Sequence, residues 1–230
     1  MFGISNEVFE IPVGDLILPA ELGGALTMRR TAVILHGGAA DGLPSIRQGI
    51  ALALATESFA VVDISLVLPF ERKRRTPVSE RTLQSRAAEA VSFVARNVGA
   101  PVAAIGLGPF AGAAIAAAGS SPSDVSAIAV FGQAPRAPRA RVRAVRAPAL
   151  LISEQRDAAT IEMFTALAED LPGVSEVRLL ARRGTPERIE ELVATWCVRH
   201  TPSVVPLAAI ERAEVGERVQ LVAVAHPEVS

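Results

Sequence analysis

The sequence has a single cysteine, Cys197, among its 230 residues. One cysteine cannot close a disulfide within the chain, so a reducing compartment is the natural expectation. Residues 1–10 also lack the basic-then-apolar order of a secretory signal and already carry acidic side chains. Together these absences predict a cytoplasmic protein.

A clear membrane-spanning segment is also missing. Residues 100–119 carry no charge and approach the required length, but Pro101, Pro109 and several glycines interrupt them. Such punctuation favours a buried strand, turn and helix over a helix that crosses a bilayer. We therefore expect no membrane association.

Signs of nucleic-acid and metal binding are equally scarce. Basic residues gather at positions 72–75 and 136–146, but no aromatic residues interleave them as stacking platforms for bases. The simpler interpretation is solvated loops balanced by nearby acids such as Glu71 and Glu80. No spacing of His, Cys, Asp or Glu indicates a metal site. The sequence thus predicts no nucleic-acid partner, no metal and no other cofactor.

Apolar residues, in contrast, are abundant. They make up 50% of the chain, the formal net charge is -1, and no internal repeat or break in composition divides the sequence. A chain of this length can bury a large core within one domain. We expect one domain over residues 1–200, followed by a C-terminal tail at residues 201–230.

Strands and helices alternate along the expected domain. Residues 8–12 and 16–19 are typical of two strands around a Val-Gly-Asp turn, and residues 133–147 of a loop rich in proline and arginine. Further strands are expected at residues 31–35, 59–64, 102–105, 125–131, 149–153 and 174–180, and helices at 44–56, 79–97, a small-residue segment ending at 118, 160–171 and 185–200. This alternation predicts a doubly wound α/β fold, with a mostly parallel sheet and helices on both faces.

The tail differs from the domain in its pattern. A linker punctuated by Pro202 and Pro206 leads to a strand-like run at residues 218–225 (RVQLVAVA). An added strand needs a sheet edge, either in its own chain or in a partner. We therefore expect a protein partner that binds through the tail or through a sheet edge.

Three loops that follow expected strands carry a resemblance to a known family. In open α/β sheets such loops hold the functional sites. Residues 32–38 (AVILHGG), 103–112 (AAIGLGPFAG) and 148–157 (PALLISEQRD) are similar, in that order, to the oxyanion loop, the nucleophile elbow and the acid-bearing strand of dienelactone-hydrolase-like α/β-hydrolases. The resemblance extends from about residue 8 to residue 200, and it implies an α/β-hydrolase-like fold.

The elbow departs from the family pattern. The family needs a Ser or Cys nucleophile, an acid and a His, in that chain order. Here the nucleophile position falls on Gly108, which has no side chain, and Pro109 has no backbone N–H to donate to an oxyanion. Losing one oxyanion donor alone costs about a hundred- to a thousandfold in rate. The elbow has therefore lost both functions.

The place of the catalytic His is also vacant. Residues 181–184 (ARRG) form the loop that would carry it, and Thr185 and Pro186 then begin a helix at once. Asp157 keeps the acid position of the resemblance but has no His to orient. We expect no intact catalytic residue, with Gly108 and Asp157 as relic positions.

The remaining positions of the resemblance are expected to bind rather than react. His36, Gly37 and Gly38 match the oxyanion loop, and we interpret His36 as a loop anchor whose ring bonds to backbone. Phe110 replaces the second glycine of the elbow and is expected to fill the pocket in which members of the family bind their substrate, here called the old pocket. The predicted binding residues are thus His36, Gly37, Gly38, Pro109 and Phe110.

These losses favour a non-catalytic homologue that acts by binding a protein partner or a small ligand at the old pocket. One alternative is an ester or lactone hydrolase in which Asp157 and His226 activate a water nucleophile. Another is a nucleotide-binding protein, because residues 106–111 (GLGPFA) satisfy G-x-G-x-x-A between a strand and a helix. Against it, the next strand ends at residues 130–133 without an acid to hold a ribose.

Overall fold

A computed structural model describes residues 7–23, 28–37, 43–74, 76–133, 135–154, 157–180 and 186–203. Its strands are β1 (Glu7–Val13), β2 (Leu16–Gly23), β3 (Arg30–His36), β4 (Phe59–Ser65), β5 (Val102–Leu107), β6 (Val125–Phe131), β7 (Ala149–Ser153) and β8 (Ser175–Leu179). Its helices are α1 (Pro44–Thr56), α2 (Glu80–Val98), α3 (Ala111–Ser120), α4 (Arg139–Ala144), α5 (Ala158–Asp170) and α6 (Pro186–His200).

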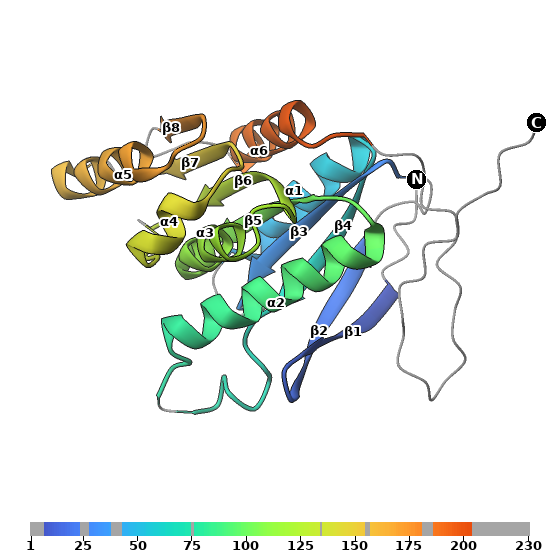
Figure 1. The fold of residues 1–230 in the computed structure, drawn as a ribbon. Helices are drawn as coiled ribbons and strands as arrows, with labels where there is room; N and C mark the ends of the chain where they lie inside the picture. Colours follow the sequence, from blue (N-terminus) through green and yellow to red (C-terminus); the bar gives the residue numbers. More distant parts are fainter. Residues whose placement is uncertain are drawn as a thin grey trace, which may run out of the picture.

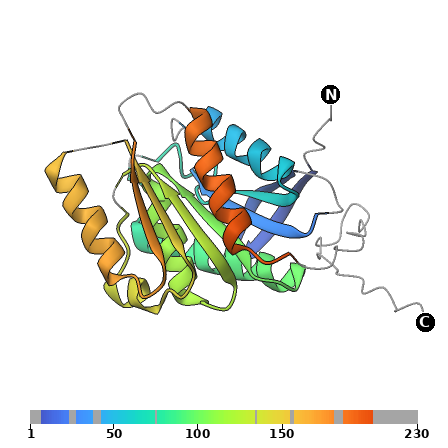
Figure 2. The same ribbon diagram turned by 90° about the horizontal axis from the view of Figure 1, so that it is seen from above.

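The strands form one sheet in the order β1-β2-β4-β3-β5-β6-β7-β8. β1 pairs with β2 and β2 with β4 in antiparallel fashion, and all pairs from β4 through β3 to β8 are parallel. Figures 1 and 2 show α1 and α6 on one face of the sheet and α2, α3 and α4 on the other. The predicted doubly wound, mostly parallel architecture is confirmed.

Each face of the sheet carries its own apolar core. The larger cluster joins inward residues of the strands with α2 and α3, and the smaller one joins the opposite strand residues with α1 and α6. Trp196 and Cys197 lie in the smaller cluster. The alternation of side chains along a strand produces this division, since neighbouring residues face opposite layers.

Local signals in the sequence explain where α2 begins and ends. Ser79 caps its N-terminus, because its Oγ accepts a hydrogen bond of 3.1 Å from the backbone N–H of Thr82. Gly99 ends the helix at φ 66°, a left-handed conformation that glycine adopts without a steric penalty. Both ends agree with the sequence prediction.

Two predictions near the arginine-rich segments are corrected. The segment predicted as a loop at residues 133–147 contains the short helix α4. Glu71, expected to balance the basic residues at positions 72–75, instead pairs with Arg86 of α2, with Nη1 to Oε2 and Nη2 to Oε1 distances of 2.7 Å. Neither the short helix α4 nor the Glu71–Arg86 pair is evident from the local sequence.

Among the described residues, no helix is long and apolar enough to cross a membrane. The predicted tail strand at residues 218–225 lies outside the described part of the chain. Gly38, His226 and the loop at residues 181–184 also lie outside it.

Candidate functional site

A tight turn lies between β5 and α3. Gly108 takes a left-handed φ of 56°, and Pro109 and Phe110 follow in a single 3-10 turn that leads into the helix. A side chain added at Gly108 would place its Cβ 3.2 Å from Cδ1 of Leu43. The strand-turn-helix geometry of a nucleophile elbow is therefore present, but Gly108 projects no group from it and Leu43 crowds the space above.

Phe110 closes the space between the elbow and the end of β3. Its ring is 6% exposed, and a Cβ added at Gly37 would lie 2.5 Å from the ring atom Cζ. Such a distance is shorter than any real contact, so the ring rests directly on the Gly37 backbone. A side chain at Gly37 would therefore displace the Phe110 ring. The ring occupies the side of the elbow where the resemblance places an oxyanion.

His36 lies buried at the end of β3 within a cluster of charged side chains. Its Nε2 is 2.8 Å from Oδ1 of Asp63 on β4, and its Nδ1 is 2.7 Å from Nη1 of Arg47 on α1. Arg47 Nε lies 3.2 Å from the other carboxylate oxygen, Oδ2, of Asp63. A guanidinium only donates hydrogen bonds, so Nδ1 of His36 accepts from Arg47, and Nε2 lies beside the Asp63 carboxylate.

This cluster ties the end of β3 to β4 and α1. The sequence-based interpretation had the His36 ring bonding to backbone, whereas the ring partners described above are side chains of β4 and α1. The backbone contributes through a separate bond, in which the Leu66 N–H donates to the His36 carbonyl over 2.8 Å. The side-chain partners, Asp63 and Arg47, carry no sequence motif that would have revealed them.

Asp157 is exposed and caps the N-terminus of α5. Its Oδ1 accepts the backbone N–H of Thr160 at 2.9 Å, and its Oδ2 accepts the Thr160 hydroxyl at 2.7 Å. These bonds from the Thr160 hydroxyl and N–H lower the pKa of the Asp157 carboxyl. Both carboxylate oxygens thus have helix-capping partners, and α5 begins two residues before the predicted start at Thr160 for this reason.

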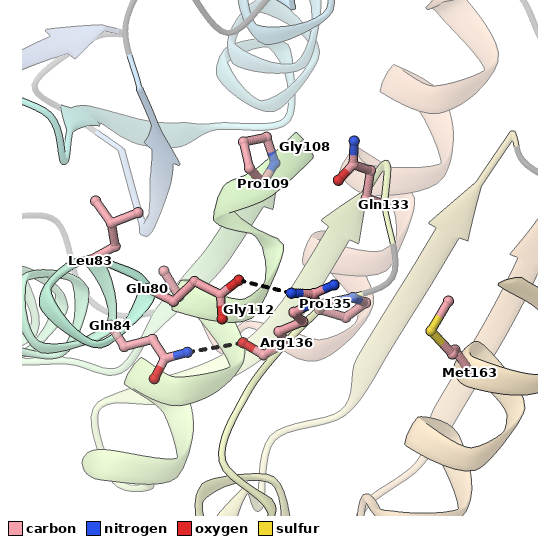
Figure 3. A pocket seen from close by; sticks show the side chains of 11 residues that line it. Glu80, Leu83, Gln84, Gly108, Pro109, Gly112, Gln133, Pro135, Arg136 and Met163 are labelled. Carbon is pink, nitrogen blue, oxygen red and sulfur yellow. Dashed lines mark hydrogen bonds and ion pairs between the residues drawn. The ribbon is translucent and has the colours of Figure 1, made fainter. Parts of the chain in front are cut away.

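A cavity of about 370 Å³ opens beside the elbow, on the α2 and α3 side of the sheet. Figure 3 shows Pro109 and Gln133 at one side and Met163 of α5 across from α2. Nη1 of Arg136 lies 3.7 Å from Oε1 of Glu80, and Gln84 Nε2 donates to the Arg136 carbonyl oxygen over 2.9 Å (Figure 3). The lining therefore combines apolar surface with two amides, a carboxylate and a guanidinium.

The structure brings only part of the predicted set to this cavity. Gly108 and Pro109 line it. Phe110 and Gly37 instead pack on one another, and His36 belongs to the buried charged cluster. Sequence reasoning missed the contributions of Glu80, Gln84, Arg136 and Met163, because helix α2, the segment before α4 and helix α5 meet only in three dimensions.

Two glycines near the turn allow close packing of the backbone. A Cβ added at Gly132, which follows β6 at φ 121°, would lie 2.9 Å from the Gly108 Cα, so the two backbones touch. A Cβ at Gly112 would lie 2.2 Å from the Arg136 carbonyl oxygen. At both positions the absence of a side chain lets the protein backbone pack closely on itself.

Within the part of the chain that the structure describes, no group of three or more His, Cys, Asp or Glu side chains is placed to hold a metal ion.

Comparisons with known proteins find no matching family model and no matching curated protein. Solved structures do match. A dienelactone hydrolase from Anabaena variabilis superposes with a TM-score of 0.76 at 21% identity, covering 87% of this chain and 100% of that one. A dienelactone-hydrolase-like promiscuous phosphotriesterase from metagenomic libraries has a TM-score of 0.60 at 16% identity, over 78% and 82%.

A zinc-bound, cold-adapted esterase from an Arctic intertidal metagenomic library also matches, with a TM-score of 0.65 at 12% identity, covering 86% of this chain and 95% of that one. At identities this low, the structural superposition establishes the fold, whereas the chemistry has to be argued from the residues of the site. The chain therefore has an α/β-hydrolase fold of the dienelactone-hydrolase type, and the solved proteins that share it include hydrolases and esterases.

Proposed function

We propose that this protein is a binding protein on a hydrolase fold, which takes a small ligand into the cavity beside Gly108 and Pro109 and does not hydrolyse esters by a serine-type mechanism. The observation that carries the proposal is the elbow itself. Gly108 holds the left-handed conformation of the nucleophile position with no group to attack a carbonyl. Pro109 follows without the N–H that stabilises a tetrahedral intermediate.

The other side chains that the resemblance singles out have structural partners. Asp157 directs both carboxylate oxygens to Thr160 at the start of α5. His36 faces Asp63 and Arg47 on the α1 side of the sheet rather than the cavity. Phe110 covers the Gly37 backbone, which removes room for an oxyanion at that end of the elbow.

The cavity supports ligand binding by its size and lining. A volume of about 370 Å³ lies within the usual range of small-molecule sites. Its polar groups come from Glu80, Gln84, Gln133 and Arg136, and they surround apolar surface that includes Met163. The Glu80–Arg136 pair is 61% and 83% exposed at the side chains, so an incoming ligand separates these charges at little cost.

The absence of serine-type chemistry is tested by labelling the purified protein with a fluorophosphonate probe beside turnover of short-chain p-nitrophenyl esters. We expect neither labelling nor turnover. Labelling would show that a nucleophile exists and would overturn the proposal.

Binding in the cavity is tested with anilinonaphthalene sulfonate, a fluorescent probe of apolar sites. Gln133 lies exposed at the cavity, so Gln133→Trp places a large ring in the opening. Gln48→Trp makes the same change at an exposed position of α1, on the opposite face of the sheet. We expect saturable binding to the parent and to Gln48→Trp, with at least about a tenfold weaker affinity in Gln133→Trp. Equal affinity in the two variants would refute the assigned cavity.

A second candidate function is an ester or lactone hydrolase with rearranged catalytic residues. It is favoured by the solved hydrolases and esterases that share the fold. In that case the parent protein hydrolyses esters but is not labelled by the probe, and Asp157→Asn or His226→Ala abolishes the hydrolysis. Unchanged turnover in both variants would remove these residues from the mechanism.

We also propose a cytoplasmic location, because the lone Cys197 is buried and cannot form a disulfide within the chain. Cell fractionation tests this location.

A further inference from the structure

The loop between β4 and α2 carries basic side chains that are not balanced by an acid. Arg72, Lys73 and Arg74 are exposed. Glu71 precedes them in the sequence, but both of its carboxylate oxygens lie 2.7 Å from the guanidinium of Arg86 on α2. Within the described part of the chain, none of the three basic side chains forms an ion pair. The loop therefore presents three positive charges to solvent.

An exposed aromatic ring lies among these charges. Phe70 is 52% exposed, and it is the only aromatic residue among the large apolar side chains that the described residues expose. The guanidinium carbon of Arg74 lies 5.3 Å from the centroid of the Phe70 ring. A single exposed apolar side chain is common on protein surfaces. Here, however, the ring and the cations occupy the same short loop, so they can contact one partner together.

Hydrogen bonds at its base hold the loop in shape. The Glu71 N–H donates to the Leu68 carbonyl over 2.9 Å, and the Arg74 N–H donates to the Glu71 carbonyl over 3.0 Å. Nη2 of Arg72 donates to the Ser65 hydroxyl over 2.9 Å, and this neutral acceptor leaves the Arg72 charge uncompensated. Figure 1 shows the loop projecting from the body of the molecule beside the start of α2. An ordered loop loses less conformational entropy when it binds.

A ring flanked by cations matches the chemistry of an anionic lipid surface. The negative potential of such a surface attracts basic side chains, and an aromatic ring enters the boundary between the headgroups and the acyl chains. Single-stranded nucleic acids fit less well, because they stack successive bases on several rings and the loop offers only Phe70. The sequence-based expectation of no membrane association concerns a spanning helix, which a surface loop does not require.

We propose that residues 69–74 dock the protein reversibly onto a membrane surface rich in anionic lipids. The Phe70 ring enters the headgroup boundary, and Arg72, Lys73 and Arg74 lie beside the lipid phosphates. Each basic side chain near such a surface raises partitioning about fivefold. Three charges and one ring therefore give a weak association, half complete at a lipid concentration on the order of millimolar. This inference goes beyond the cavity function and does not depend on it.

Sedimentation of the full-length protein with vesicles tests the docking. Vesicles of equal parts phosphatidylcholine and phosphatidylglycerol supply the anionic surface, and vesicles of phosphatidylcholine alone supply a neutral one. We expect the protein to sediment with the anionic vesicles and not with the neutral ones. Binding should also be lost at about 1 M salt, because charges are then screened within roughly 3 Å.

Two variants separate the ring from the charges. Phe70→Ala removes the ring and Lys73→Gln removes one charge, and each is expected to weaken binding to the anionic vesicles about fivefold. Leu52→Ala on α1 and Arg141→Gln on α4 are matched controls, because both side chains are exposed and belong to other elements. The controls should bind like the parent. Equal urea midpoints show that every variant is folded.

Three outcomes would overturn the proposal. Failure to sediment with the anionic vesicles means that the protein does not dock on such a surface. Equal weakening in the loop variants and in the two controls means that the loop is not the docking site. Binding that Lys73→Gln weakens but Phe70→Ala leaves unchanged means that the loop is a purely electrostatic surface, and tighter binding to single-stranded DNA would then assign it to nucleic acid.

Discussion

Gly108 combines the backbone conformation expected at a nucleophile elbow with the absence of a side chain. Its φ of 56° is the backbone conformation of a nucleophile elbow, and for an L-amino acid with a side chain that conformation costs about 1–2 kcal/mol. Hydrolases bear this cost because the strained residue attacks the substrate. Here glycine holds the turn without strain, so the elbow is a packing feature.

The serine that the fold lacks should not restore hydrolysis when it is put back. Gly108→Ser is expected to remain unlabelled by a fluorophosphonate, because Pro109 supplies no N–H and Asp157 is engaged at α5. We also expect it to lower the free energy of unfolding by more than Gly99→Ser does. Both positions have left-handed φ, 56° and 66°, but nothing lies within 4 Å of a Cβ at Gly99, whereas Leu43 crowds Gly108.

Urea unfolding compares the stabilities of Gly108→Ser and Gly99→Ser. Labelling by the fluorophosphonate probe is measured on the same samples. Equal destabilisation would show that Leu43 moves aside freely. Labelling of Gly108→Ser would show that a working base is present.

The hydrogen bonds of Asp157 to Thr160 show that it caps the N-terminus of α5. Asp157→Ala should lower the urea midpoint of the protein, because the Thr160 N–H loses its acceptor at the start of α5. Asp157→Ser should recover most of the loss, since serine is also a good N-cap. A catalytic acid would behave differently, because serine cannot replace it and both variants would lose any ester turnover equally.

At the scale of elements, the segment between β4 and α2 is held by a buried ion pair. The side chains of Glu71 and Arg86 are 9% and 6% exposed, and a Glu71 carboxylate oxygen also accepts the Leu68 N–H at 2.9 Å. Arg86 Nη1 further donates to the Leu66 carbonyl at 2.8 Å. The pair ties the end of β4 to the first turns of α2, which line the cavity.

Removing one partner of this pair should be costly. We expect Glu71→Gln to reduce the free energy of unfolding by about 3 kcal/mol, because Arg86 is left as a buried charge without a counterion. Glu80→Gln breaks the exposed pair with Arg136 and should cost less than about 1 kcal/mol. Similar losses in the two variants, measured by urea unfolding, would contradict the buried-pair interpretation.

The Glu71–Arg86 pair also makes part of the free energy of unfolding sensitive to acid. The hydrogen bonds from Arg86 lower the pKa of the Glu71 carboxyl in the folded chain, whereas the unfolded chain keeps the ordinary value. The stabilisation is therefore complete above the ordinary pKa and is lost as the pH falls through the lowered one. Glu71→Gln should flatten this part of the profile of unfolding free energy against pH.

At the scale of the whole molecule, two apolar layers enclose the sheet, and Cys197 reports on one of them. The thiol is fully buried between α6 and the sheet, and burial raises its pKa to about 12. We expect a thiol reagent to label the native protein only through global unfolding or release of α6. Labelling rates should therefore rise with urea in parallel with unfolding, and rapid labelling in native buffer would show that α6 detaches easily.

Much of the architecture is determined by the sequence itself. The hairpin of β1 and β2, the alternation that follows, and the ends of α2 at Ser79 and Gly99 all rest on local signals, such as period, caps and turn residues. The same holds for the missing chemistry of the elbow, because Gly108 and Pro109 cannot supply groups that their side chains and backbone lack.

The tertiary structure alone decided how the site is filled. The contact of Phe110 with Gly37, the cluster of His36 with Asp63 and Arg47, and the cavity wall from α2 and α5 join residues that are distant in sequence. Local sequence patterns report the period and ends of elements, but they do not specify which side chains of different elements meet. Those contacts follow from the packing of helices on the sheet, and they produce a packed turn beside an open cavity.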